Sequence, residues 1–179
     1  MRNGDDGGAL AGGSGRVYPF GDVLALARQS WLGQMASRLE SRGYPGYHRS
    51  DAAALRLLAR EPLPVGQLGT ALGVTRQAAR KVAAALQQRG YATTARDPDD
   101  ARRLNVTLTP AGHDYAGAIV AVIDQLNREV AQRTDPAQLA AADAVLRAAL
   151  FDDSTRHRAD WLPRPPHLPS PLDERYSQS

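Results

Sequence analysis

A tight turn at Gly73 and Val74, set between two short segments of helical pattern, is the feature that most constrains the fold. Before the turn, Leu68 and Leu72 are apolar and stand one helical turn apart. After it, Thr75 is of a residue type that caps the start of a helix. This order predicts two short helices joined as a helix-turn-helix.

The second of these predicted helices has two different faces. Residues three or four positions apart share one face of an α-helix. The apolar face consists of Ala79, Val82, Ala83 and Leu86. The roughly opposite face consists of Gln77, Arg80, Lys81 and Ala84. Gly90 then follows, where the end of a helix favours a residue that tolerates a positive φ.

Two segments of strand-like composition, 91–96 and 104–108, come next. The turn-prone stretch between them contains the adjacent arginines Arg102 and Arg103. Two helices followed by a basic hairpin predict a winged helix-turn-helix, which is a unit that holds double-stranded DNA. The predicted fold class is mainly α with a small β-hairpin wing, in which a winged helix-turn-helix domain is joined to a helical dimerisation domain.

The placement of charge supports a DNA partner more strongly than the total charge does. The whole chain has a formal net charge of +3. Residues 75–104 contain seven basic and three acidic side chains, a net charge of +4, so the rest of the chain carries −1. The basic excess therefore lies in the proposed reading helix and wing, as expected of a surface that binds a polyanion.

A spaced motif in and after the wing consists of Asp100, Arg102, Val106, Leu108, Thr109 and Gly112. This motif resembles the wing signature of the MarR family of transcriptional regulators. The resemblance covers roughly residues 49–112, is weaker over the flanking helices and is absent from both tails. Gly69 stands where the family more usually has alanine; it weakens its helix but allows close approach of the next one.

The exposed residues of the second motif helix are the candidates for reading DNA. Arg76 and Arg80 can contact guanine, Gln77 can contact adenine, and each of these side chains or Lys81 can instead contact only phosphate. Thr75 is expected to cap the helix rather than to read sequence, and its hydroxyl can also meet a phosphate.

At the wing, the resemblance implies that Arg102 enters the minor groove and that Asp100 orients it through an ion pair. Arg103 is the rival for this role. The alternative interpretation is a surface Asp–Arg pair that only stabilises the hairpin tip, worth less than ~1 kcal/mol. Both interpretations can hold together, because an ordered arginine loses less entropy on binding.

The chain is expected to form one domain with two tails. Residues 1–16 form a disordered lead, 17–151 the MarR-like domain and 152–179 a proline-rich, mostly disordered tail. Within the domain, the winged helix-turn-helix spans about 49–109, and the dimerisation helices span about 20–42 and 110–151. Ser50 or Asp51 is expected to cap the helix that precedes the motif.

The flanking helices must bury their apolar faces, and a two-fold homodimer, which the family also forms, does so economically. Each subunit then presents one reading helix about one DNA turn (~34 Å) from its mate, to a palindromic operator. The resemblance also implies a small-molecule effector between the dimer helices and the winged domain. Trp31, Tyr44, Tyr47 and His48 are candidates to line that crevice, although core or hinge roles are favoured for the aromatics.

Several other classes of protein are disfavoured. The chain has no cysteine, which excludes disulfides and thiol switches. The scattered histidines lack metal-ligand spacing, and no nucleophile elbow or phosphate-binding loop is present, so neither an enzyme nor a cofactor is expected. No signal peptide or membrane-spanning run is visible, so a cytoplasmic location is expected. The rival function is a winged helix used for protein interaction, without specific DNA binding.

Overall fold

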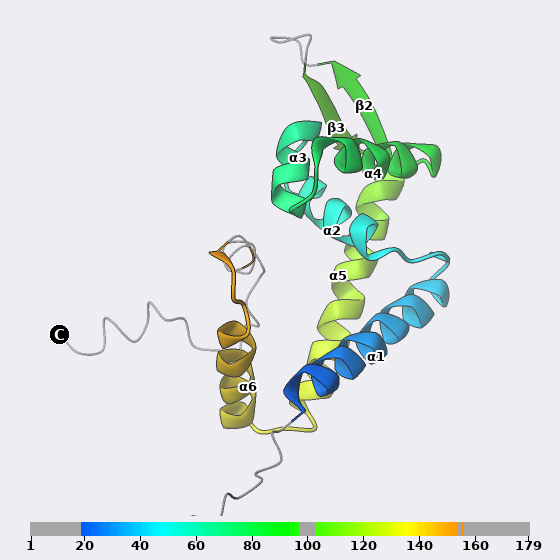
Figure 1. Cartoon of the computed structure of the whole chain (residues 1–179). Helices are drawn as coiled ribbons and strands as arrows, with labels where there is room; N and C mark the ends of the chain where they lie inside the picture. The colour runs from blue at the N-terminus through cyan, green and yellow to red at the C-terminus, as the bar shows by residue number, and fades with distance from the viewer. Residues whose placement is uncertain (1–18, 97–102, 154, 156–179) are drawn as a thin grey trace, which may run out of the picture.

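The computed structural model describes residues 19–96, 103–153 and 155, and its chain is mainly helical with one small sheet (Figure 1). The elements in order are α1 (Phe20–Glu40), α2 (Arg49–Leu58), β1 (Leu63–Pro64), α3 (Val65–Leu72), α4 (Arg76–Gln88), β2 (Ala92–Arg96), β3 (Leu104–Leu108), α5 (Pro110–Ala131) and α6 (Pro136–Ala148). The predicted fold class is confirmed. The predicted disordered lead lies outside the described residues, as does most of the predicted disordered tail.

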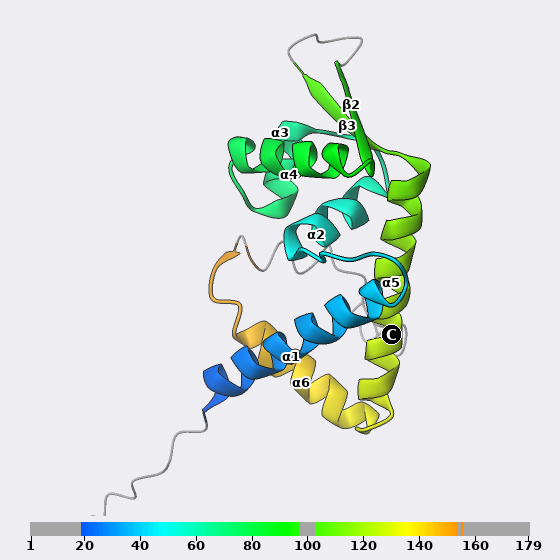
Figure 2. The ribbon, with the colours of Figure 1, turned by 90° about the vertical axis from the view of Figure 1, so that its right-hand side faces the viewer.

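The sheet is antiparallel, with the strand order β1-β3-β2. Strands β2 and β3 form the predicted hairpin, with Ala92 opposite Leu108 and Arg96 opposite Leu104. The two-residue strand β1 was not predicted, because a strand this short that includes a proline has no strand pattern in the sequence. Figure 2 shows the hairpin extending beyond α3 and α4, away from the rest of the molecule.

Local sequence signals set the ends of several helices as predicted. The Thr75 hydroxyl accepts a hydrogen bond from the Ala78 amide at 3.2 Å and so caps α4. Gly73 ends α3 with a φ of 67°, and Gly90 follows α4 with a φ of 77°. At α6, Asp135 forms a capping box with Gln138.

The start of α2 differs from the prediction that Ser50 or Asp51 caps it. The N-cap is His48, and no side chain makes a capping hydrogen bond there. Asp51 lies inside the first turn and is buried, with its carboxylate directed to Arg89. The Asp51 carboxylate therefore pairs with Arg89 and does not cap α2.

The hydrophobic core lies where α2, α3, α4, β3 and most of α5 meet the C-terminal end of α1. Its largest fully buried side chains are Tyr115, Met35, Leu39, Leu55, Leu68, Leu86, Ile119, Val65, Val106 and Val122. Much of the rest is alanine, including Ala79 and Ala83 on the inner face of α4. Small side chains bring the helices close together but bury little apolar area each.

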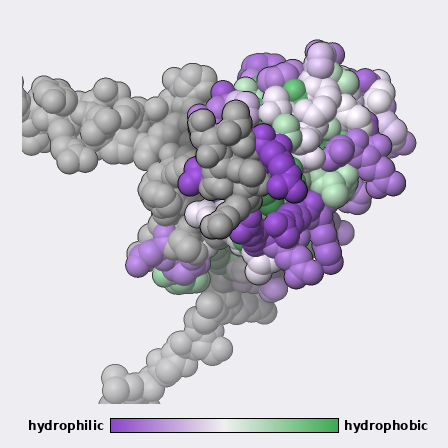
Figure 3. Space-filling view, turned by 90° about the horizontal axis from the view of Figure 1, so that it is seen from above, coloured by the Kyte–Doolittle hydropathy of each residue, from purple (hydrophilic) through white to green (hydrophobic). Residues whose placement is uncertain are grey.

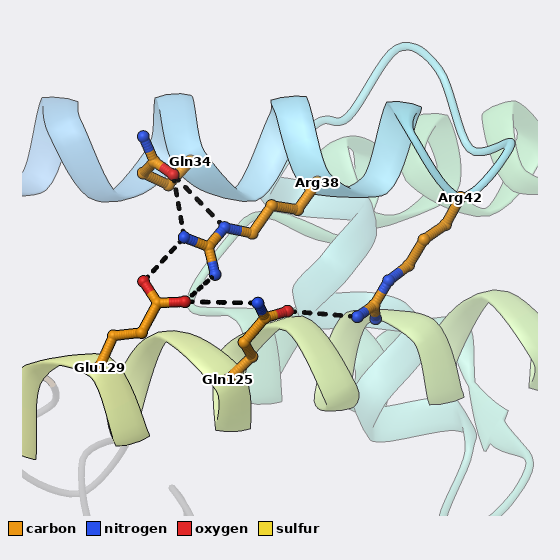
Figure 4. Close-up of polar contacts among 5 residues, drawn as sticks. All are labelled: Gln34, Arg38, Arg42, Gln125 and Glu129. Atoms are coloured by element: carbon orange, nitrogen blue, oxygen red, sulfur yellow. Dashed lines mark hydrogen bonds and ion pairs between the residues drawn. The ribbon is translucent and has the colours of Figure 1, made fainter. Parts of the chain in front are cut away.

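Polar side chains fasten α1 to α5 (Figure 4). The Arg38 guanidinium donates to both carboxylate oxygens of Glu129, at 2.6 and 2.8 Å, and to Gln34 of its own helix. Gln125 donates to Glu129 at 3.3 Å and accepts from Arg42 at 3.3 Å. The hydrogen bond from Arg38 lowers the pKa of the Glu129 carboxyl below its ordinary value.

The end of the molecule away from the hairpin leaves apolar side chains exposed. No residue of α6 is buried, and in α1 only Met35 and Leu39, near its C-terminal end, are buried. Figure 1 shows α6 standing apart from α1 and α5. The exposed large hydrophobic residues on or directly after these three helices are Val23, Leu24, Leu26, Val120, Val130, Val145, Leu146 and Phe151. Within the described residues, no helix has both the length and the apolar composition of a bilayer span.

Candidate nucleic-acid interface

Helix α4 presents the polar face that its periodicity predicted. Ala79, Ala83 and Leu86 are buried against the domain. The exposed residues are Arg76, Gln77, Arg80, Lys81, Ala84, Gln87 and Gln88. No large hydrophobic side chain of α4 is exposed. The outer face of this helix is therefore suited to a polar, negatively charged partner.

The N-terminal end of α4 carries positive charge and no acidic residue. The first turns of α1 and α2 contain Asp22 and Asp51, whereas the first turn of α4 has no acidic residue and begins with Arg76. Because unpaired amides already make a helix N-terminus positive, an arginine there disfavours the isolated helix and favours a bound anion. A phosphate contact by Thr75 remains a prediction, since its hydroxyl is seen only as the cap.

Gly69 lets α3 and α4 approach each other closely. A Cβ added at Gly69 would lie 3.2 Å from the Val74 carbonyl oxygen and 3.3 Å from the Ala79 Cβ. The sequence-based interpretation of this glycine is therefore correct. The close packing fixes the angle at which α4 leaves the turn, and so the direction of its exposed face.

The wing is attached to the end of α4. The Thr94 hydroxyl on β2 donates a hydrogen bond to the Gln87 side-chain oxygen at 3.0 Å. Arg103 is exposed just before β3. Asp100 and Arg102 lie outside the described residues, so their pairing and their roles stay predictions. Figure 3 looks down on this end and shows mainly hydrophilic side chains on the described surface, with small hydrophobic patches between them.

A partly buried ion pair at the C-terminal end of α4 was not predicted from the sequence. The Arg89 guanidinium lies 2.5 Å from the Asp51 carboxylate, and its carbon lies 5.5 Å from the centre of the Tyr91 ring. Asp51 is the one buried charged residue in the described part of the chain. A single acidic residue 38 positions away from its partner gives no sequence signal of pairing.

An open cavity of about 460 Å³ lies between the segment that leads into α2 and the second half of α4. Its lining residues are Pro45, Gly46, His48, Ser50, Asp51, Lys81, Val82, Ala85, Gln88 and Arg89. Of the four residues proposed for an effector, His48 lines this cavity. Trp31, Tyr44 and Tyr47 do not, and pack half-buried against the core. This packing agrees with the core or hinge roles favoured for the aromatics.

Tyr44 belongs to an aromatic cluster that joins three segments. Its ring stacks on that of Tyr115 in α5, with centroids 4.6 Å apart, and the Tyr91 ring lies 4.9 Å from Tyr115 on another side. Burial is the main cause that raises the pKa of Tyr115 to about 12. The cluster connects the loop after α1, the end of α4 and the start of α5.

Comparisons with known proteins agree with this geometry. The MarR family model matches residues 46–103, which include α2, α3, α4 and the first strand of the hairpin. This part of the chain is therefore similar to the MarR family. Members of this family are transcriptional regulators rather than enzymes. No match was found among curated proteins.

Solved structures of the same fold cover most of the chain. A probable transcriptional regulator from Pseudomonas aeruginosa is 27% identical, with 73% of this chain and 96% of that chain covered and a TM-score of 0.62. The S. aureus MepR–DNA complex is 16% identical, with 75% and 98% covered and a TM-score of 0.65. A mutant MarR from E. coli with operator DNA is 17% identical, with 74% and 94% covered and a TM-score of 0.63.

Proposed function

We propose that this chain is a MarR-family regulator that binds a palindromic operator as a homodimer and represses transcription, and that a small-molecule effector releases it. In this proposal α4 enters the major groove, and the hairpin reaches the adjacent minor groove. The observation that carries the proposal is the exposed face of α4, with three basic side chains and no large hydrophobic one, beside a projecting hairpin.

The exposed side chains of α4 differ in the DNA contacts that they suit. Arg76, Gln77 and Arg80 stand on the first two turns, which are the part of a reading helix that meets base edges. A guanidinium forks onto guanine, and a glutamine amide pairs with adenine. Lys81 is a point charge, better suited to a phosphate. Arg102, oriented by Asp100, and Arg103 are the proposed contacts of the wing.

Apolar exposure at the far end supports a homodimer. The first half of α1 and all of α6 contain no buried residue, although both carry large aliphatic side chains. Patches of this kind mark protein interfaces. A second copy that covers them places two reading helices on one face of the duplex, as a two-fold palindrome requires. The solved MepR and MarR complexes with DNA support the DNA partner.

The cavity beside α4 supports an effector site. Because it is lined by both Lys81 and Arg89 of the α4 segment, an occupant would contact the reading element itself. A ligand that binds better to a DNA-incompetent arrangement shifts the protein away from its operator. Trp31, Tyr44 and Tyr47 are then supporting residues behind the site, and His48 is a lining residue.

Fluorescence anisotropy tests the DNA-binding proposal. The protein is titrated onto the duplex that it selects from a random-sequence library and onto a scrambled duplex, over a salt series. We expect at least a hundredfold preference for the selected duplex and a steep loss of affinity with salt. Arg80→Ala and Arg102→Ala should each weaken binding to the selected duplex by tenfold or more. Equal, weak binding to both duplexes would favour the rival, a protein-interaction module.

A further inference from the structure

Two backbone hydrogen bonds around Gly90 close the C-terminal end of α4. The Tyr91 amide donates to the Leu86 carbonyl at 2.9 Å, and the Gly90 amide donates to the Gln87 carbonyl at 2.9 Å. This pair of hydrogen bonds around a left-handed glycine is the Schellman arrangement. Neither bond uses the carbonyl oxygens of Gly90 and Tyr91, which lie at the point where the chain leaves the reading helix.

Both of these carbonyl oxygens are bound by one residue, Thr109. Its hydroxyl donates to the Gly90 oxygen at 2.7 Å, and its amide donates to the Tyr91 oxygen at 3.1 Å. The same hydroxyl oxygen accepts from the Gly112 amide at 3.1 Å and caps α5. A single side chain therefore caps α5 and ties its first turn to the end of α4.

Gly112 shows how close this approach is. A Cβ added there would collide with the carbonyl oxygen of Tyr91, which is backbone and cannot turn aside. One turn further on, the Tyr115 ring packs against the Tyr91 ring. We call the contact among Gly90, Tyr91, Thr109 and Gly112 the α4–α5 joint.

The α4–α5 joint lies at the N-terminal end of the long helix α5. Helix α5 has 22 residues, which at 1.5 Å each make it about 33 Å long. It begins beside the hairpin and ends near the exposed apolar surfaces of α1 and α6 (Figure 1). A tilt of only about 5° at the joint shifts the far end by roughly 3 Å relative to α4. That shift is close to the rise of one base pair, about 3.4 Å.

We propose that Thr109 is a positioning residue that fixes α4 relative to α5 and thereby sets which half-site spacing the dimer accepts. This inference rests on the proposed function, since it requires a dimer that reads two half-sites. Thr109 itself contacts no base in this proposal. It acts through the direction of α4, and its hydroxyl must donate to Gly90 as well as cap α5.

Two substitutions at Thr109 distinguish its capping of α5 from its hydrogen bond to Gly90. Thr109→Ser keeps a hydroxyl that both donates and accepts. Thr109→Asp keeps a strong N-cap acceptor for α5, but a carboxylate cannot donate to the Gly90 oxygen. Thr107→Asp is the matched control, because it adds the same charge at an exposed position of β3 outside the joint.

The measurement is the affinity of each full-length variant for the duplex that the wild type selects from a random library, and for the same duplex with one central base pair inserted or removed. Thermal unfolding by circular dichroism shows that each variant is folded at the assay temperature. We expect the wild type, Thr109→Ser and Thr107→Asp to prefer the native spacing by at least tenfold. For Thr109→Asp we expect the preference to fall below threefold.

The outcomes are distinct. A folded Thr109→Asp variant that keeps the tenfold spacing preference overturns the inference while the proposed function stands. If the Thr109→Asp variant does not fold, the test uses Thr109→Ala, which lacks the hydroxyl but adds no charge. A Thr109→Ala variant that keeps the tenfold spacing preference also overturns the inference. If the wild type selects no sequence, the proposed function fails, and the inference fails with it.

Discussion

Arg89, the residue that ends α4, holds the carboxylate of Asp51 in the first turn of α2 at 2.5 Å. The Asp51 side chain is 6% exposed and that of Arg89 is 31% exposed, so the acid is the more buried partner. The pair joins the reading helix to the helix that precedes the motif. Because the two partners differ in burial, their removal has unequal consequences.

We expect Arg89→Gln to lower the free energy of unfolding by about 2–3 kcal/mol, because it leaves the Asp51 carboxylate buried without its cation. Asp51→Asn should cost less, about 1 kcal/mol, because Arg89 can turn toward water. The double variant should be more stable than the sum of the two losses predicts. Urea unfolding of all four proteins measures these energies, and strictly additive losses would show that the pair is not coupled.

Two glycines of α3 make a matched pair. Gly69→Ala should destabilise the protein by about 1–3 kcal/mol, because the new methyl meets the Val74 carbonyl and Ala79. Gly66→Ala should stabilise it by about 0.5 kcal/mol, because no atom lies within 4 Å of the added Cβ and alanine favours a helix. Thermal unfolding compares them. A Gly69→Ala variant as stable as Gly66→Ala would mean that α3 and α4 do not pack this closely.

The raised pKa of Tyr115 gives a prediction at alkaline pH. Its pKa in the folded protein is about 12, against an ordinary value of 10. The contribution to stability is therefore complete below pH 10 and is lost as the pH rises through about 12. Absorbance at 295 nm should show a tyrosine that ionises near pH 12, and Tyr115→Phe should remove that step. An unchanged titration curve for Tyr115→Phe would show that the ring is not buried as described.

Paired substitutions to glutamate test the separation of dimerisation from DNA binding. Leu146→Glu on α6 should shift the protein from dimer to monomer, because it places a charge on the exposed apolar surface. Ala84→Glu on the outer face of α4 should leave the dimer intact but weaken DNA binding by tenfold or more, through repulsion of phosphates. Light scattering and anisotropy measure the two properties. A monomeric wild type would contradict the proposed dimer.

The features that the sequence predicted correctly depend on interactions between residues close together in the chain. Thr75 caps α4, and Gly73 and Gly90 adopt left-handed conformations, because each needs only neighbours within a few residues. The inner and outer faces of α4 follow from the period of the helix in the same way.

Contacts across the chain could not be predicted in this way. Asp51 was expected as a possible cap, and only the folded chain brings Arg89 to it. The pairing of β1 with β3 depends on the register of Leu63 opposite Val106, which a two-residue strand that includes a proline does not specify. The double use of Thr109, as cap and as link to Gly90, becomes visible only when α4 and α5 are placed together.

The most direct test of the central claim is a hydroxyl-radical footprint of the protein on the duplex that it selects, together with the stoichiometry of the complex. The account predicts two chains per duplex and a two-fold symmetric footprint, with two equivalent half-sites whose centres lie about one helical turn apart, roughly 10 base pairs. A single unsymmetric footprint from one chain, or no protection at all, would contradict it.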